Sequence, residues 1–303
     1  MRPLVSILIP AYNAEKSIAY TLRSALAQTW PHKEIIVIND GSNDGTAEIL
    51  REFGSKEVRI VSTENRGLST AVNYALQLSQ GDYIQELDAD DLLVPDKIER
   101  QLAAASEVNN KRVLLSSPWA PFYYRTRNAR FVHSSLCQDL SPVDWLLRKM
   151  NDNVHMQNAT WLMSRELAEA VGPWDERLHY DQDGEYFARA VVASESIRFV
   201  PGTGVYYRAS SASTRISHIG KSNRKKDSLL LSMKLHVQYL RSLEDSERIR
   251  TACLAYLQNW YYVFYPERPD AVLELQALAA QLQGRLEHRV LSPAVTGSWW
   301  ASC

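Results

Sequence analysis

The stretch that decides the fold is LVSILIPAYNAE, residues 4–15. Its first seven residues form an apolar run, which is typical of a strand that is buried on both faces. Asn13 is a residue type that caps helices, so we expect a helix over about residues 14–28. A strand buried on both faces and followed at once by a helix predicts a parallel sheet covered by helices.

The same unit recurs along the first part of the chain. Helices separate further expected strands, which lie at residues 34–40, 58–63, 82–88 and 112–117. This alternation predicts an α/β fold with a doubly wound, mostly parallel sheet. In such sheets ligands bind beyond the carboxyl ends of the strands. We therefore expect the polar residues at three of these ends to lie together, namely those of Pro10–Asn13, Asn39–Asp40 and Asp88–Asp91.

The pattern weakens after the fifth expected strand. A further strand is expected at residues 158–164, and residues 197–210 are expected to form a β-hairpin. Helices dominate the remainder, at about residues 228–243, 245–264 and 270–287.

Composition excludes several classes of protein. The chain has 303 residues and a formal net charge of −1, so it lacks the overall basic character of a nucleic-acid-binding protein. Its three cysteines are widely spaced, which indicates neither a disulfide framework nor a zinc site and favours the cytoplasm. No run approaches the roughly 20 apolar residues of a membrane span. We expect any contact with the inner face of a membrane to be peripheral.

The stretch LDADD, residues 87–91, ends an expected strand on three carboxylates. Asp88 and Asp90 point the same way on an extended backbone, and crowded carboxylates raise one another's pKa unless a cation lies between them. Mg²⁺ and Mn²⁺ bind one or two carboxylates together with phosphate oxygens. The alternative is an acidic turn in solvent that caps the next helix. A calcium loop is excluded, because Leu93 stands where its obligatory glycine would be.

Two further carboxylates stand next to expected helices. Asp40 follows a strand and offers an acceptor to a nucleobase or a ribose, although Asp also serves ordinary turns. In YDQDGEYFARA, residues 180–190, Asp183 begins a helix. A carboxylate there is normally a cap, but in a cleft it would be a general base. No GxGxxG or Walker A sequence is present, so the usual dinucleotide and P-loop sites are not supported.

Five stretches together resemble the inverting nucleotide-sugar glycosyltransferases of family 2, which have the glycosyltransferase A-type fold. They are VSILIPAYNAEKSIAYTLRSALAQTW, EIIVINDGSNDGT, NRGLSTAVNYAL, GDYIQELDADD and GPWDERLHYDQDGEYFARA, and they keep the family's order from residue 4 to about 209. The resemblance implies a catalytic domain at residues 1–215, with a nucleotide-sugar-binding half (1–116) and an acceptor-binding half (117–215). A helical C-terminal region, residues 216–303, lies outside the resemblance.

The resemblance implies how the donor is bound. Pro10, Ala11 and Tyr12 would line the nucleotide pocket, with Tyr12 against the base. Asp40 would recognise that base, typically uracil, so a UDP-sugar is the expected donor. Gly67 would let the backbone approach the nucleotide.

It also implies how the reaction is carried out. Asp88 would contact the ribose, and Asp90 would bind the Mn²⁺ or Mg²⁺ that bridges the diphosphate, with Asp91 in support. Asp183 would be the catalytic base. The expected residues on the acceptor side are Gln182, Arg189 and Trp119.

Three departures from the family pattern stand out. Val72 replaces an arginine that often contacts the nucleotide, with Arg66 as a candidate substitute. Gln182 replaces an acid. Residues 209–210 are Ala and Ser where many relatives have a histidine, and His218 is either a late metal ligand or a loop histidine in solvent.

These features predict transfer of a sugar to a hydroxyl of a glycan or lipid-linked acceptor, in polysaccharide, glycolipid or other surface-glycan biosynthesis. The rings of the segment Trp119–Tyr124, with those of Trp161 and Trp174, would stack on the sugar rings of the acceptor. The alternative is that these side chains pack in the core, and we favour this alternative for Trp161. The alternative function is a non-catalytic nucleotide-sugar-binding protein. A basic run precedes an amphipathic helix at residues 221–235, so peripheral membrane binding stays open. The sequence does not determine the oligomeric state.

Overall fold

The computed structural model describes residues 2–108, 110–209, 219–220 and 222–287. Its strands are β1 (Val5–Ala11), β2 (Lys33–Asp40), β3 (Val58–Thr63), β4 (Tyr83–Glu86), β5 (Leu92–Leu93), β6 (Val113–Ser116), β7 (Trp119–Phe122), β8 (Met163–Ser164), β9 (Ser196–Phe199) and β10 (Val205–Arg208). Its α-helices are α1 (Ile18–Leu26), α2 (Thr46–Arg51), α3 (Leu68–Leu78), α4 (Lys97–Val108), α5 (Pro142–Asn151), α6 (Arg165–Val171), α7 (Gln182–Ala193), α8 (Asn223–Leu243), α9 (Glu247–Tyr261) and α10 (Pro269–Gln281). Two short 3₁₀ helices are η1 (Thr126–Asn128) and η2 (Asn158–Thr160).

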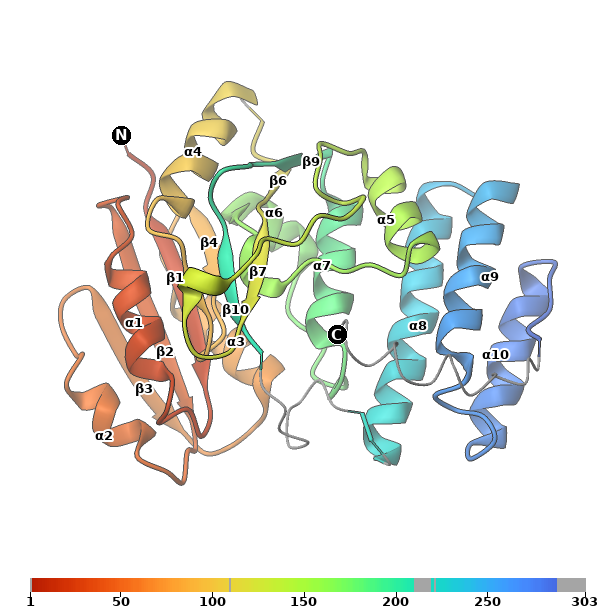
Figure 1. Ribbon diagram of the computed structural model, residues 1–303, viewed down its shortest axis with the longest axis horizontal. Helices are drawn as coiled ribbons and strands as arrows, with labels where there is room; N and C mark the ends of the chain where they lie inside the picture. The colour runs from red at the N-terminus through yellow and green to blue at the C-terminus, as the bar shows by residue number, and fades with distance from the viewer. Residues whose placement is uncertain (1, 109, 210–218, 221, 288–303) are drawn as a thin grey trace.

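The central sheet has five strands in the order β3-β2-β1-β4-β8 (Figure 1). The pairs β3–β2, β2–β1 and β1–β4 are parallel, and β8 is antiparallel to β4. This arrangement confirms the predicted mostly parallel α/β sheet. It also places the ends of β1, β2 and β4 at one edge, where parallel sheets bind their ligands.

Strand β1 is buried on both faces, as its apolar run predicts. Ile7 and Ile9 belong to one hydrophobic cluster, while Leu8 between them belongs to the other. Neighbouring β2 alternates in the same way, with Ile35 in the first cluster and Ile36 in the second. Two separate hydrophobic clusters therefore pack against the two faces of the strands whose ends form the candidate site.

The prediction that residues 112–117 form the fifth parallel strand of this sheet is wrong. The edge of β4 is occupied by β8, through the register Ile84↔Met163. β6 instead pairs in parallel with β9, and an isolated bridge between Leu115 and Leu162 links it to the segment that leads into β8.

The predicted hairpin at residues 197–210 is also wrong. β9 and β10 belong to different sheets, because β10 pairs with β5 and β7. Gly204 permits the pairing of β10 with β7: a Cβ there would lie 2.3 Å from the Pro118 carbonyl oxygen, so only glycine lets β10 approach β7 this closely.

Asn13 does not cap α1, which begins only after the N-cap Ser17. Asn13 has a φ of 49°, and its Oδ1 accepts a hydrogen bond from Asn43 N at 2.8 Å. The side chain therefore joins two strand-end loops instead of capping a helix.

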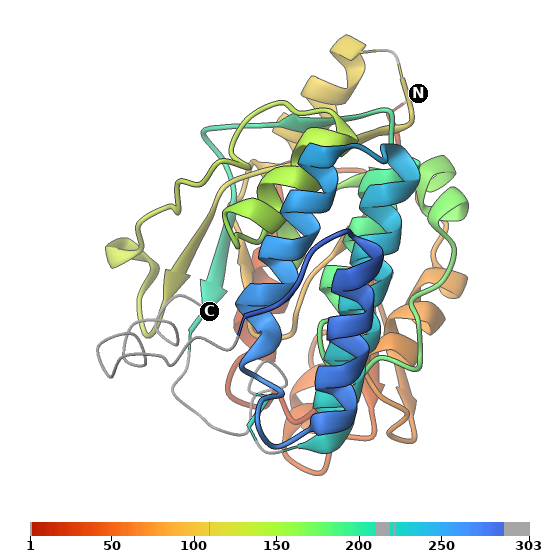
Figure 2. The same ribbon diagram turned by 90° about the vertical axis from the view of Figure 1, so that its right-hand side faces the viewer.

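The C-terminal region is helical, as predicted, and it is joined to the sheet domain by a shared core. Figure 2 shows α8, α9 and α10 lying alongside one another. One hydrophobic cluster includes Leu8 of β1, Phe187 of α7, Leu257 of α9 and Leu275 of α10. No helix among the described residues has the length and apolar character needed to cross a membrane.

Candidate active site

Three loops at the carboxyl edge of the sheet are tied to one another. Asn13 N donates to Ser42 Oγ at 3.0 Å, and Ala14 N donates to Thr46 Oγ1 at 2.8 Å. Gly41 packs so closely on the third loop that a Cβ would lie 2.5 Å from Asn65 N. The ends of β1, β2 and β3 therefore form one rigid rim.

The predicted nucleotide-binding residues lie on this rim. Pro10 is half-buried and Ala11 is buried at the end of β1, and Tyr12 follows with half of its surface exposed. Asp40 is 3% exposed, and its two oxygens accept from Arg66 N at 2.8 Å and Gly67 N at 2.9 Å. Its carboxylate thus fixes the turn that opens α3, and its contact with a base stays a prediction.

The backbone conformation at position 67 requires a glycine. Its φ is 93°, in the region that favours glycine. A Cβ added there would meet nothing within 4 Å. The space beside Gly67 is therefore open, which fits close approach of a ligand.

The three acids after β4 have different surroundings. Asp91 is completely buried and accepts from Arg208 N at 2.8 Å and Gln157 Nε2 at 2.5 Å. Asp88 is half-buried and accepts from Asn158 Nδ2 at 3.3 Å. Asp90 is also half-buried, and its backbone carbonyl accepts from Arg208 Nε. Asp91 is thus a supporting residue, while the Asp88 and Asp90 side chains lie nearer to solvent.

Asp183 lies in the first turn of α7 and is half-buried. Desolvation, and after it the charge of Asp181, raise the pKa of Asp183 above its ordinary value. Asp181 itself has a left-handed backbone with φ 58°. Its side chain occupies the space beside Gly184, where a Cβ would lie 2.1 Å from Asp181 Oδ1.

Glu86 connects the two acidic groups. It is 4% exposed, one oxygen accepts from Trp174 Nε1 at 3.0 Å, and Oε2 has no hydrogen-bond partner. Burial raises its pKa well above the ordinary value, the Trp174 bond opposes this, and the charges of Asp88 and Asp183 add to the rise. The strand-end acids and the α7 acid therefore lie within electrostatic reach of one carboxyl group.

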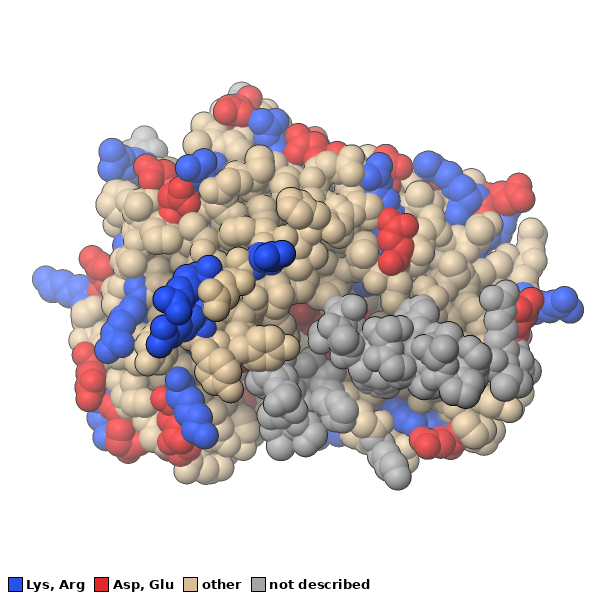
Figure 3. Space-filling view, viewed as in Figure 1, with Lys and Arg blue, Asp and Glu red and all other residues tan. Residues whose placement is uncertain are grey.

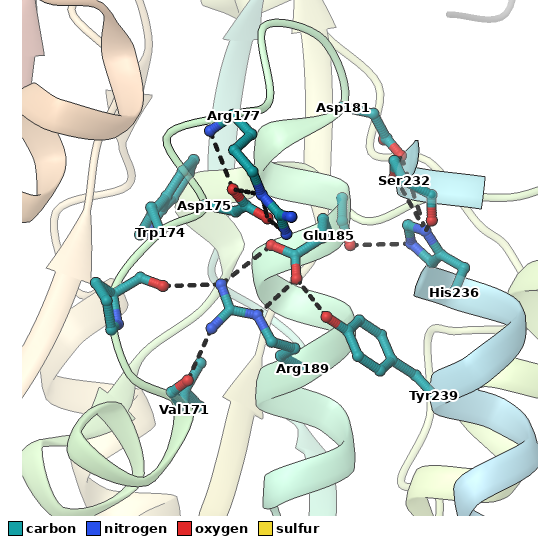
Figure 4. A network of polar contacts seen from close by, with 12 residues as sticks. Val171, Trp174, Asp175, Arg177, Asp181, Glu185, Arg189, Ser232, His236 and Tyr239 are labelled. Atoms are coloured by element: carbon teal, nitrogen blue, oxygen red, sulfur yellow. Dashed lines mark hydrogen bonds and ion pairs between the residues drawn. The ribbon is translucent and has the colours of Figure 1, made fainter. Parts of the chain in front are cut away.

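A polar stripe on α8 holds the segment that carries Asp183, and Figure 4 shows two of its members, Ser232 and His236, beside Asp181. Ser228 Oγ accepts from His179 N at 2.8 Å and donates to Tyr180 O at 2.9 Å. One turn later, Ser232 Oγ donates to Asp181 Oδ2 at 2.5 Å. One turn further, the ring of His236 lies 3.1 Å from Gly184 O.

His236 is not an acid–base partner for this cluster. Burial and the charge of Lys149 lower its pKa to about 3, so the ring is neutral at pH 7. Ser232, His236 and Asp181 form a constellation like that of a serine hydrolase, but Ser232 is fully buried and its hydroxyl is donated to Asp181. The three residues position the loop and offer no accessible nucleophile.

Two of the predicted acceptor-side residues, Arg189 and Gln182, are engaged or buried within the protein. Arg189 donates to both oxygens of Glu185 and to the carbonyls of Val171 and Pro173 (Figure 4). These contacts give it a bracing role, and Gln182 is buried. Contact of either residue with an acceptor stays a prediction.

The aromatic rings divide between the core and the surface. Trp161 and Trp174 are both 2% exposed. This burial confirms the core packing that we favour for Trp161, and it shows that the acceptor-platform alternative is wrong for Trp174. Trp119 is half-buried against the rings of His155 and Tyr207.

Two positions at which the sequence departs from the family pattern lie away from the rim or outside the described chain. Val72 is in the core at 1% exposure, so its side chain does not face the rim. His218 lies outside the described residues. Among the described residues, no group of three or more His, Cys, Asp or Glu side chains is arranged to hold a metal ion.

Sequence reasoning missed Glu86 and the α8 stripe. Glu86 had a usable signal, since it is an acid inside the apolar run of an expected buried strand. The stripe also had one, because Ser228, Ser232 and His236 recur every four residues and so share a helix face.

The sequence pattern of Glycosyl transferase family 2 matches residues 6–172. The chain belongs to this family. The match ends before α7, so Asp183 lies outside it. An uncharacterized glycosyltransferase of Rickettsia typhi is 34% identical over 181 residues, which are 60% of this chain and 56% of that protein. Chondroitin synthase of Escherichia coli is 46% identical over 99 residues, 32% of this chain and 14% of the synthase.

Among solved structures, S. aureus TarS 1–349 in complex with UDP-GlcNAc matches with a TM-score of 0.73 and 17% identity. The match covers 92% of this chain and 81% of that one, so the two share the glycosyltransferase A-type fold. In contrast, the chain spans only about half of the length of the Rickettsia relative.

The raised pKa of Glu86 predicts a pH-dependent gain from Glu86→Gln. As pH rises, the unfolded chain loses the Glu86 proton before the folded protein does. The contribution of Glu86 to stability is therefore complete below the ordinary pKa of a glutamate, and it is lost as the pH rises through the raised pKa of the folded state. Glutamine keeps an acceptor for Trp174 and cannot ionise. Its advantage in unfolding free energy over the wild type should grow by about 1 kcal/mol or more from pH 4 to pH 8.

Denaturant unfolding at several pH values measures this difference. Glu169→Gln, at an exposed position of α6, is the control and should show no growing advantage. A constant difference for Glu86→Gln across the range would contradict a raised pKa of Glu86.

The α8 stripe predicts that Ser232→Ala lowers stability by about 1–3 kcal/mol, because Asp181 loses a buried donor. Ser242→Ala is the matched control on the same helix, since Ser242 is exposed and should change stability by less than about 0.5 kcal/mol. Thermal unfolding of both variants tests this. Equal melting temperatures would argue against a holding role for the stripe.

Proposed function

We propose that the chain transfers a sugar, with inversion, from a UDP-sugar to a hydroxyl group of a glycan or lipid-linked acceptor. The observation that carries this proposal is the meeting of two acidic groups at buried Glu86, whose pKa responds to both Asp88 and Asp183. Membership of family 2 and the fold shared with a UDP-GlcNAc complex support the donor class. A chondroitin synthase among the relatives supports a role in glycan synthesis.

In the proposed reaction, the acceptor oxygen bonds to the anomeric carbon while the bond from that carbon to the diphosphate oxygen breaks on the opposite face. Asp183 takes the proton of the acceptor hydroxyl, and the UDP leaves with the bonding electron pair. The raised pKa of Asp183 makes it a stronger base than an ordinary aspartate. The rim of Tyr12, Asp40 and Gly67 would hold the nucleotide and fix the direction of attack.

The residues present could bind a divalent cation only together with the nucleotide-sugar donor. The carboxylates of Asp88 and Asp90 are half-buried at the open end of β4, whereas Asp91 is used inside the protein. Mg²⁺ and Mn²⁺ are commonly bound by one or two carboxylates together with substrate phosphates, so Asp90 would hold the ion with the diphosphate. The ion would neutralise charge on the leaving phosphate.

Asp183→Asn should reduce transfer by about 10²–10⁴-fold, because the amide cannot take the proton. Donor binding, measured by calorimetry, should stay near the wild-type value. In the wild type, the acid limb of the pH–rate profile should lie above the ordinary range of an aspartate. Glu169→Gln provides the control, and normal turnover by Asp183→Asn would refute this base.

Asp90→Ala should remove the dependence of donor binding on Mn²⁺ or Mg²⁺. The measurement is a thermal-shift panel of nucleotide sugars with and without each ion, since a ligand that binds the folded state raises the melting temperature. A response of the wild type to UDP-sugars, in preference to other nucleotide sugars, is expected. Undiminished metal-dependent binding by Asp90→Ala would count against its role.

The alternative, a nucleotide-sugar-binding protein without activity, shares the donor response and differs in turnover. Release of UDP, measured with and without acceptor glycans, separates the two. Binding without any UDP release would favour the alternative.

A further inference from the structure

A basic, aromatic loop projects beside the candidate active site. It comprises residues 123–130, YYRTRNAR, and is called here the arginine loop. It follows β7 and contains η1. Figure 3 shows Lys and Arg side chains gathered over the part of the surface where η1 lies in the view of Figure 1.

Both ends of the arginine loop are fixed. Phe122 is buried at the end of β7 and pairs with Arg208 of β10. After the loop, the Phe131 ring packs 5.8 Å from the Tyr206 ring, and Val132 N donates to Trp119 O at 2.8 Å. The loop is therefore presented on a rigid base rather than attached by a free end.

The side chains of the loop are turned outward. Tyr124 is 94% exposed and Tyr123 is 64% exposed. Arg125, Arg127 and Arg130 are exposed, and none of them forms an ion pair within the described parts of the chain.

The charge of the loop is not balanced along the sequence. No Asp or Glu occurs between residues 119 and 138, so three guanidinium groups within six residues repel one another. In a chain of net charge −1, this is a local field that attracts anions to one place.

The base of the loop adjoins the predicted donor site. The Arg208 guanidinium lies 4.6 Å above the Phe122 ring, and its Nε donates to Asp90 O at 2.9 Å. Arg208 N also donates to Asp91. Strand β10 therefore separates the start of the arginine loop from the acids that are expected to face the diphosphate. An acceptor chain that reaches the proposed reaction centre would pass beside this strand.

We infer that the arginine loop binds an acceptor glycan that carries carboxylate or phosphate groups. Guanidinium groups form paired hydrogen bonds with both kinds of anion, and exposed tyrosines offer flat apolar faces to sugar rings. Two functions on one loop, charge and flat rings, match an anionic sugar chain better than either a free anion or a neutral glycan. The inference rests on the proposed transferase function, of which it specifies the acceptor.

The test measures binding of soluble anionic glycans to the full chain. Oligogalacturonate supplies carboxylates, polyphosphate supplies phosphates without sugar, and dextran is the neutral control. The wild type should bind one or both polyanions, with an affinity that falls as salt rises, and should not bind dextran. Preference for oligogalacturonate would assign the anion as carboxylate, and preference for polyphosphate would assign it as phosphate.

The variant Arg125→Gln/Arg127→Gln/Arg130→Gln should weaken polyanion binding by about tenfold or more. The control Lys56→Gln/Arg59→Gln/Arg285→Gln removes the same charge from exposed positions outside the loop and should bind as the wild type does. Tyr123→Ala/Tyr124→Ala should weaken oligogalacturonate more than polyphosphate. Equal binding by the two triple variants, or equal binding of dextran, would overturn the inference.

Two further measurements distinguish an anionic glycan from an anionic membrane surface, and a failed acceptor site from a failed donor site. In flotation with vesicles containing phosphatidylglycerol, loop-dependent flotation without binding of either soluble polyanion would overturn the glycan assignment. Thermal shifts with UDP-sugars should be the same for the wild type and the arginine-loop variant. A normal donor response with no polyanion binding refutes this inference alone, whereas polyanion binding with no donor response refutes the proposed function.

Discussion

The buried carboxylate of Asp91 joins parts of the chain that are far apart in sequence. Its oxygens accept from Arg208 N, 117 residues away, and from Gln157 Nε2, 66 residues away. A carboxylate removed from water is stable only with such donors, so the acid determines which segments close over the end of β4. Asp91 thereby ties the end of β10 and the residue before η2 to the end of β4.

A second constraint is the crowding of acidic side chains around Glu86. Glu86, Asp88, Asp181 and Asp183 are held by different means, since like charges in a partly dry site cannot all be stable. Glu86 is buried so deeply that its neutral form is favoured. Asp181 receives the Ser232 hydroxyl and Asp88 the Asn158 amide. The acids Asp88 and Asp183 near the Glu86 carboxyl group would suit the proposed binding of a cation and removal of a hydroxyl proton.

The sequence predicts the parts of this arrangement that local pattern controls. The apolar runs of β1 to β4, and the acids that follow β4, are contiguous, so the sheet and its carboxyl edge could be derived directly. The family resemblance implies that Asp91 supports metal binding, but it does not predict the contacts of Asp91 with Arg208 and Gln157. In contrast, β6, β9 and β10 have four residues each, too few to reveal a partner, and their pairing depends on β8 and Gly204. The roles of Glu86 and Asn13 also depend on contacts with distant residues.

The polar stripe of α8 has a consequence for the order in which the protein is assembled. The residues that match family 2 end at Gly172, yet the partners that hold Asp181 come from residues 228–236. A ribosome releases the N-terminal part first, so the rim that is predicted to bind the nucleotide can form while the proposed base still lacks its supports. The emerging protein would thus acquire a donor site before it acquires a complete reaction centre. The emergence of α8 decides when the one becomes the other.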